Sequence, residues 1–283
     1  MGAFNLDFGG KQMILRPEKY INVIKIPIVD VEMIDILMAK EPKQLMDSAF
    51  NSLVKKPTFM LNGGLFGMVN GVTLSTTMDE GKLLRKDVFS NFGFYTSKDG
   101  NFGFDDLENH FKDFLGGSPS LVVNGKIQLD TKGLDDGFLN GRHPRTAIGM
   151  NKEYLYLVVV DGRRLWAKGM TCKELAIFML QLGCINAINL DGGGSTRLCK
   201  NVSGKLKPVN QPTENRAVDN FLCIYLKQNN KKTVIASKLN IRVSPKNGAV
   251  VGAYTKNEIV NVQEIKDGWA RTDKGWVCED YLV

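Results

Sequence analysis

The chain has 283 residues, 43% hydrophobic and 24% charged, so it can bury a sizeable core and shows no sign of disorder. Its longest apolar runs, such as residues 155–160, are too short to cross a bilayer, and no transmembrane segment is expected. The formal net charge of +7 comes mostly from lysines spread along the chain. A basic surface favours a polyanionic partner, but no nucleic-acid motif accompanies it, so binding of nucleic acid is not expected.

The five cysteines indicate buried, reduced thiols, because their number is odd and no CxxC pair occurs. With only His110 and His143 available, a zinc site built from His and Cys is not expected. The residues identify no cofactor and leave a divalent metal open, and no pattern indicates an oligomeric state. Because the N-terminus lacks a basic start followed by an apolar run, we expect synthesis in the cytoplasm without a signal peptide.

The first elements in chain order are strands with one helix among them. Alternating apolar and polar residues over 20–38 predict one or two strands. Helical spacing of apolar residues predicts a helix over 42–55. A short buried strand over 58–61 follows it. Two hairpins are then expected, over 90–105 and over 120–129, the second turning at an Asn-Gly pair that favours a type I′ turn.

The next elements surround the clearest helix of the chain. Strands are expected over 147–150 and 154–160, and the second is nearly all apolar, which is typical of a central strand. Thr171 and Glu174 form a capping box at the start of a helix over 171–183. Strands over 187–190 and 217–226 complete this part. We therefore expect one domain over 1–228, a polar linker over 229–233, and a small all-β domain over 234–283.

The sharpest chemical motif is the run from Asp191 to Thr196. The carboxylate of Asp191 ends a buried strand, and Gly192, Gly193 and Gly194 then remove side chains from its approach. Backbone N–H groups with the hydroxyls of Ser195 and Thr196 could bind an oxyanion there. The run lacks the lysine of a Walker motif and the spacing of GxGxxG, so it does not indicate a nucleotide site. The alternative is a purely structural turn.

Two weaker motifs stand beside other predicted strands. Asn62, Gly63 and Gly64 follow the strand at 58–61, and the two glycines allow close approach of a ligand or simply a tight turn. Arg145 and Thr146 lead into the strand at 147–150. The planar fork of an arginine suits a phosphate, although a surface arginine is the alternative.

Together these motifs resemble the phosphodiester glycosidase family. The segments that carry the resemblance, in family order, are MLNGGLF (60–66), GGSPSLVVNGKI (116–127), HPRTAIGMNKEYLYLVVVDGR (143–163), MTCKELAIFMLQLGCINAINLDGGGSTRL (170–198) and RAVDNFLCI (216–224). The resemblance implies an α+β catalytic domain with a mixed sheet. It also implies catalytic roles for Asp191, Asp161 and Arg145. Substrate contacts are implied for Asn62, Gly63, Gly64, Thr146, Gly192, Gly193, Gly194, Ser195, Thr196 and Arg216.

The C-terminal segment resembles bacterial SH3 domains. It begins with an N-x-R-x-x-P pattern at Asn240 and ends with Gly-Trp-Val at 275–277, while Asn257 stands where that family often has glycine. The resemblance implies a small SH3-like barrel that binds a cell wall or another surface glycopolymer. On a chain without a signal, such a module suggests a phage-encoded or lysin-like protein released to act at the wall; a bacterial cytosolic enzyme is the alternative.

The expected activity is hydrolysis of a sugar-1-phosphodiester at the anomeric carbon. Strong general-acid help is less necessary here than for an ordinary glycoside, because a phosphomonoester is a good leaving group. Two other classes stay open at this point. One is a non-catalytic wall-binding or glycan-binding protein, and the other is a phosphodiesterase that cleaves the P–O bond.

Overall fold

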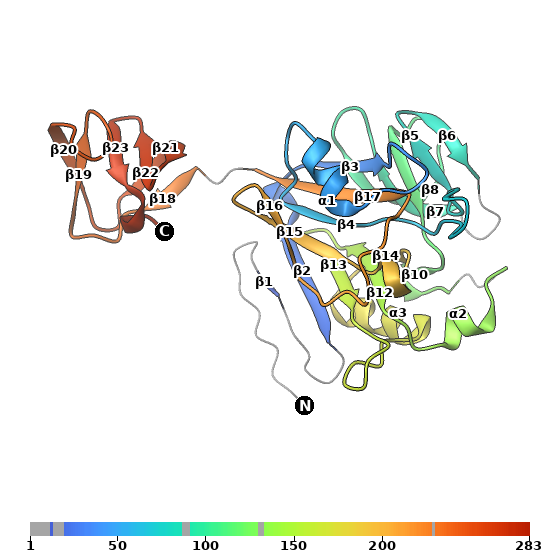
Figure 1. The fold of residues 1–283 in the computed structure, drawn as a ribbon. Coiled ribbons are helices and arrows are strands. Elements are labelled where there is room, and N and C mark those ends of the chain that lie inside the picture. Colours follow the sequence, from blue (N-terminus) through green and yellow to red (C-terminus); the bar gives the residue numbers. More distant parts are fainter. Residues whose placement is uncertain (1–11, 14–19, 87–90, 130–132, 228–229) are drawn as a thin grey trace. The chain divides into compact units, whose positions relative to one another are not determined.

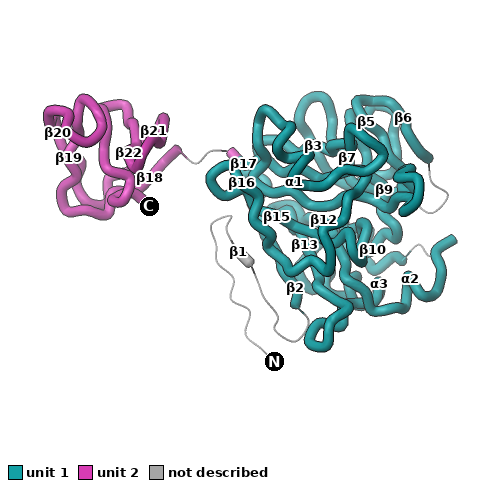
Figure 2. The backbone as a smooth tube through the Cα atoms, in the orientation of Figure 1, with its two compact units in different colours: residues 1–226 teal, residues 227–283 magenta. Residues whose placement is uncertain are grey.

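The computed structural model describes residues 12–13, 20–86, 91–129, 133–227 and 230–283 (Figure 1). The expected N-terminal features at 1–11 and 14–19 lie outside these residues. Contacts divide the chain into two compact units at Leu226 and Lys227 (Figure 2). The expected linker overlaps the second unit, because Lys231–Thr233 form strand β18 and pair with residues 259–261 of strand β21.

Two sheets form the frame of the first unit. In the order of the first sheet, the strands are β1 (Gln12–Met13), β2 (Ile21–Pro27), β13 (Tyr154–Val160), β12 (Arg145–Met150), β14 (Asn186–Asn189), β10 (Ser120–Val123) and β11 (Lys126–Ile127). In the second sheet they are β16 (Lys205–Pro208), β15 (Leu198–Val202), β4 (Phe59–Asn62), β17 (Asn220–Leu226) and β3 (Val31–Met38). Every pairing in both sheets is antiparallel among the residues described. The expected mixed sheet is therefore wrong.

A third antiparallel sheet belongs to the same unit. Its strands, in order, are β6 (Lys82–Arg85), β5 (Thr77–Asp79), β9 (Asp113–Gly116), β7 (Phe92–Thr96) and β8 (Phe102–Asp106). The pairing of β7 with β8 confirms the hairpin expected over 90–105. Sequence patterns missed β5, β6 and β9, whose runs are too short to show a period.

The main core lies between the two large sheets because each strand alternates its side chains. In β13, Leu155, Leu157 and Val159 join the core between the sheets. Tyr156, Val158 and Val160 point the other way, where helix α3 (Cys172–Gln181) covers the sheet. Helix α1 (Met46–Ser52) similarly covers the outer face of the second sheet. The result is a layered packing of helix, sheet, sheet and helix (Figure 1).

Local sequence signals determine several of these elements. The capping box of α3 is confirmed: Thr171 Oγ1 accepts from Glu174 N at 3.1 Å, and a Glu174 oxygen accepts from Thr171 N at 3.1 Å. The segment over 20–38 forms two strands, because the short 3₁₀ turn η1 (Ile28–Asp30) moves the chain from one sheet to the other. Helix α1 is shorter than the expected 42–55.

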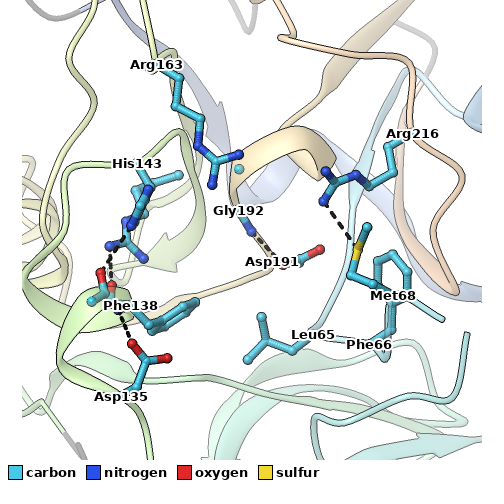
Figure 3. Close-up of a pocket in the computed structure, with 13 residues that line it drawn as sticks. Leu65, Phe66, Met68, Asp135, Phe138, His143, Arg163, Asp191, Gly192 and Arg216 are labelled. Atoms are coloured by element: carbon cyan, nitrogen blue, oxygen red, sulfur yellow. Dashed lines mark hydrogen bonds between the residues drawn. The ribbon is translucent and has the colours of Figure 1, made fainter.

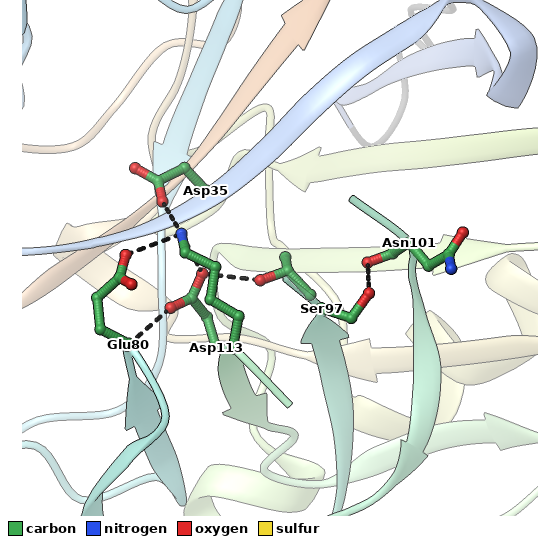
Figure 4. Close-up of polar contacts among 7 residues, drawn as sticks. Asp35, Glu80, Ser97, Asn101 and Asp113 are labelled. Carbon is green, nitrogen blue, oxygen red and sulfur yellow. Dashed lines mark hydrogen bonds and ion pairs between the residues drawn. The ribbon is translucent and has the colours of Figure 1, made fainter. Parts of the chain in front are cut away.

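A charged cluster joins the third sheet to β3 (Figure 4). Lys112 Nζ lies 3.0 Å from Glu80, 3.2 Å from Asp113 and 3.4 Å from Asp35. Burial alone would lower the pKa of Lys112, but the carboxylates of Glu80 and Asp113 outweigh it and raise that pKa. The cluster therefore fixes the third sheet against the second.

The second unit is a single six-stranded antiparallel sheet with its own core. In sheet order its strands are β18 (Lys231–Thr233), β21 (Ile259–Lys266), β22 (Trp269–Thr272), β23 (Gly275–Cys278), β19 (Lys238–Arg242) and β20 (Val250–Thr255), with a 3₁₀ turn η3 (Glu279–Tyr281) near the end. Its buried side chains include Leu239, Tyr254 and Val277. The SH3-like barrel stays a prediction. Across the described residues, no helix is long and apolar enough to cross a membrane.

Candidate active site

Four strand ends meet at one edge of the two large sheets. Strand β4 ends at Asn62, which is in register with Phe221 at the start of β17. Strand β14 ends at Asn189, in register with Ala147 at the start of β12. The registers therefore place the motif at 62–64 at an end of the second sheet and the motifs at 145–146 and 191–196 at an end of the first.

The buried side chain of Asn62 ties these motifs to one another. Its Oδ1 accepts from Thr146 Oγ1 at 2.8 Å, and its Nδ2 donates to the carbonyl of Asp191 at 2.7 Å. Asp191 N in turn donates to the carbonyl of Gly63 at 2.9 Å. Asn62 and Thr146 are both almost completely buried. They therefore fix the backbone of Asp191 from beneath rather than contact a ligand in the pocket above.

A pocket of about 400 Å³ opens above this platform (Figure 3). Its walls combine five charged side chains and a histidine with apolar residues and glycines. They are Leu65, Phe66, Met68, Asp135, Gly137, Phe138, His143, Arg145, Arg163, Asp191, Gly192, Gly193 and Arg216. Among the described residues, no three His, Cys, Asp or Glu side chains are grouped so as to hold a metal ion.

The carboxylate of Asp191 lies in this pocket. Its Oδ1 accepts from Gly192 N at 2.9 Å. Burial raises the pKa of Asp191 to about 6. The Ser195 hydroxyl, the Gly192 amide and the charges of Arg216 and Arg163 act in the opposite direction and offset part of that rise. Asp191 can therefore change protonation near neutral pH.

The glycines after Asp191 make room for arginines. A Cβ added to Gly194 would lie 1.8 Å from Glu214 Oε1 and 2.4 Å from Arg216 Nη2. Gly193 has a φ of 61°, and a Cβ there would lie 3.0 Å from Arg163 Nη2. The structure thus gives a second reason for Gly193 and Gly194, since a side chain at either position would crowd an arginine of the pocket.

Two arginines lie near the Asp191 carboxylate. Arg216 Nη2 donates to Glu214, and its Nη1 contacts Met68 Sδ at 3.4 Å. Arg163 follows β13 in a left-handed conformation with φ of 57°, which is unusual for a residue with a side chain. Sequence reasoning selected Arg216 but not Arg163, although Arg163 completes the DGR segment at 161–163.

The guanidinium of Arg145 bonds to backbone carbonyls in the wall of the pocket. Its Nε donates to the carbonyl of Met170 at 2.9 Å. Its Nη2 donates to the carbonyls of Phe138 and Gly141, at 2.5 and 3.0 Å. Only 1% of Arg145 is exposed, and burial lowers its pKa. These bonds brace helix α2 (Asp136–Asn140), and a phosphate contact from Arg145 stays a prediction.

Asp161 is not among the residues that line this pocket, and its catalytic role stays a prediction. Its Oδ1 accepts from Asn210 Nδ2 at 2.9 Å, and both of its oxygens accept from Gln211 N at 3.1 Å. Burial raises the pKa of Asp161. The two bonded residues lie in a distant segment that no local pattern connects to position 161. In this structure Asp161 holds that segment in place.

Five residues with expected substrate contacts are buried and are not among the residues that line the pocket. They are Gly63, Gly64, Gly194, Ser195 and Thr196. The lining residues that sequence reasoning missed had different signals. Leu65 and Phe66 directly follow the glycine pair, and His143 precedes Arg145, so proximity in sequence could have found them. Asp135 stands in a polar segment with no motif of its own.

Asp219 is a buried carboxyl group whose raised pKa makes the stability of the protein depend on pH. Its side chain is 4% exposed, and neither carboxylate oxygen has a hydrogen-bond partner of good geometry. Burial raises the pKa of Asp219 to about 7; nearby Thr73 and Asn220 offset part of this, and the charge of Asp191 adds to it. Because the folded pKa lies above the ordinary 3.8, folding favours the protonated form, and stability falls as pH rises from about 4 to about 7.

Asp219→Asn is therefore expected to raise the melting temperature at pH 8 and to leave it nearly unchanged near pH 4. Linkage at about 1.4 kcal/mol per pH unit puts the relieved penalty at about 4 kcal/mol or less. Thermal unfolding across this pH range measures it. Asp106→Asn, at an exposed position of β8, is the control. An equal effect of Asp219→Asn at both pH values would contradict the explanation.

Comparison with known proteins places the chain in a family. The sequence model described as phosphodiester glycosidase matches residues 55–225, more than half of the chain. The solved catalytic domain of zebrafish N-acetylglucosamine-1-phosphodiester alpha-N-acetylglucosaminidase, auto-inhibited by its pro-peptide, has a similar fold. The TM-score is 0.60 at 26% identity, over 74% of this chain and 78% of that one. The chain therefore belongs to the phosphodiester glycosidase family.

Other relatives match parts of the chain. The N-acetylglucosamine-1-phosphodiester alpha-N-acetylglucosaminidase of Mus musculus is 30% identical over 190 residues, 58% of this chain and 37% of that protein's length. An SPbeta prophage-derived uncharacterized protein of Bacillus subtilis, YomE, is 39% identical over 89 residues, 31% of this chain and 14% of that protein. This chain thus spans well under half the length of either relative.

Proposed function

We propose that the first unit hydrolyses a sugar-1-phosphodiester at the anomeric carbon and releases a free sugar and a phosphomonoester. The observation that carries this proposal is a single pocket that holds the Asp191 carboxylate together with Arg163 and Arg216. A phosphodiester bears the negative charge that two arginines bind well. The family relationship to enzymes named for a GlcNAc-1-phosphodiester supports the same substrate class.

The pocket suits the charge changes of this reaction. As the C1–O bond breaks, positive charge develops on the sugar and negative charge on the phosphate oxygen. Arg163 and Arg216 stabilise the negative charge as it forms. Asp191, whose pKa burial raises to about 6, can hold a proton beside the departing oxygen. Protonation also reduces the repulsion between this carboxyl group and the bound phosphate.

The test is a product assay on a panel of sugar-1-phosphodiesters that includes wall teichoic acids. We expect a reducing sugar and a phosphomonoester in equal amounts from at least one member. Binding without turnover across the panel would instead favour a non-catalytic glycan-binding protein.

We further propose that the second unit targets the enzyme to an anionic wall glycopolymer. This unit carries ten Lys and Arg against six Asp and Glu over 227–283, which gives it a basic surface suited to an anionic polymer. Its own hydrophobic core supports independent folding. The similarity of part of the chain to a prophage-derived protein supports a phage origin.

Removal of residues 227–283 is expected to leave kcat/KM on small soluble substrates within about threefold of the full chain. Among the described residues, those that line the pocket all belong to the first unit, which has its own cores. Sedimentation with purified cell walls should show weaker binding by the shortened protein. Loss of turnover in a shortened protein that is still folded would show that the second unit takes part in catalysis.

A further inference from the structure

A second carboxylate, that of Asp135, lines the same pocket as Asp191. Asp135 stands at the N-cap of α2, where its Oδ1 accepts from Phe138 N at 2.8 Å. The capping bond engages one of its two oxygens. Asp135 is exposed, and it belongs to no motif discussed above. It is the one further Asp or Glu among the described residues that line this pocket.

The helix that carries Asp135 is held firmly against β12. The buried guanidinium of Arg145 bonds to the carbonyl of Phe138 within α2 and to that of Gly141 just after it. Its third bond, to Met170, joins α2 to the segment before α3. A carboxylate at the start of α2 therefore has a fixed position relative to the strand ends beneath the pocket, as a catalytic group requires.

Charges are distributed unevenly in the pocket. The cations that act on the Asp191 carboxylate are Arg216 and Arg163. In the view of Figure 3, both arginines lie on the Gly192 side of Asp191, and Asp135 lies on the opposite side with Phe138. A phosphate held by the arginines therefore leaves the sugar to extend toward Asp135 and the apolar residues.

We propose that Asp135 is the second catalytic carboxylate, which faces the anomeric carbon while Arg163 and Arg216 hold the phosphate. The proposal rests on the function proposed above. Asp135 would stabilise the positive charge that develops on the sugar ring in the transition state, as a carboxylate does in glycosidases. Asp135 thus takes the place that sequence reasoning gave to Asp161.

Asp135→Asn separates this role from helix capping, because Asn caps a helix as well as Asp does. The variant is expected to lose at least about a hundredfold in kcat, with KM within about threefold and an unchanged melting temperature. Asp136→Asn is the matched control. Asp136 is the next residue, bonds to Asn140 and does not line the pocket. Its kcat should stay within about twofold of the parent.

Chemical rescue tests the charge itself. Asp135→Ala removes the carboxylate. Added formate should raise kcat of this variant, in the full-length protein, by at least about tenfold. A purely structural role of Asp135 would not allow such rescue. If the parent cleaves a panel substrate but Asp135→Asn keeps kcat within about threefold, the assignment of Asp135 is overturned and the proposed function stands. If Asp135→Asn is slow but formate restores nothing to Asp135→Ala, the charge-stabilising role is overturned. If the parent cleaves no member of the panel, both proposals fail together.

Discussion

Asp191→Asn is expected to lower kcat by about a thousandfold or more while the protein folds normally. The substitution keeps the shape of the side chain and the acceptor for Gly192 N, so the local backbone should not change. It removes a carboxyl group whose pKa burial raises to about 6 and which lies near two arginines. General acid–base and electrostatic contributions of such a group are each worth about a hundredfold or more.

Steady-state kinetics on the best panel substrate, with circular dichroism as a check on folding, measure this effect. Asp161→Asn is an informative control, because Asp161 is buried but lies outside the pocket lining. It should lower stability by about 1–3 kcal/mol, since the amide nitrogen that replaces Oδ2 cannot accept from Gln211 N. Its kcat should stay much closer to that of the parent. A folded Asp191→Asn variant within about tenfold of the parent would refute the assignment of Asp191.

Arg216→Lys is expected to lower kcat/KM for a sugar-1-phosphodiester by about thirtyfold, or about 2 kcal/mol. Lysine keeps the charge and can still pair with Glu214, but it loses the planar fork that binds two phosphate oxygens. A neutral glycoside of the same sugar has no phosphate, so any slow cleavage of it should change little.

The comparison between the two substrates identifies the role of Arg216. Arg142→Lys is the matched control, since Arg142 pairs with Glu174 on the outside of α3 and does not line the pocket. It should affect neither substrate by more than about twofold. If Arg216→Lys lowers turnover of the charged and the neutral substrate equally, Arg216 supports the pocket rather than the phosphate.

Much of the fold follows from local patterns in the sequence. The capping box of α3 and the type I′ turn at Asn124 and Gly125 depend on a few neighbouring residues, and both occur as expected. The alternating side chains of β13 are also a local property, which the two cores on either side of it confirm. Strand direction is not local. It depends on which distant strands pair, such as β13 with β2 and β17 with β3, and these pairings are antiparallel where a mixed sheet was expected.

The site was only partly predictable, for a similar reason. Asp161 and Asp191 follow apolar strands in the same way, but long-range bonds from Asn210 and Gln211 bury one of them. Arg145 begins β12 and Arg216 comes shortly before β17, yet three backbone carbonyls take up most of the Arg145 guanidinium. Asp135 reaches the pocket because α2 packs against α3 and bonds to Arg145 of β12, and no motif around Asp135 encodes these contacts.

The most direct test of the proposed chemistry is hydrolysis of a sugar-1-phosphodiester in water enriched in oxygen-18. Cleavage of the C1–O bond places the solvent oxygen on the anomeric carbon and leaves the bridging oxygen on the phosphate. Mass spectrometry of both products should therefore find the label in the released sugar and none above background in the phosphomonoester. Label in the phosphomonoester instead would mean that the P–O bond breaks, and it would contradict the assignment of this pocket to glycosidic cleavage.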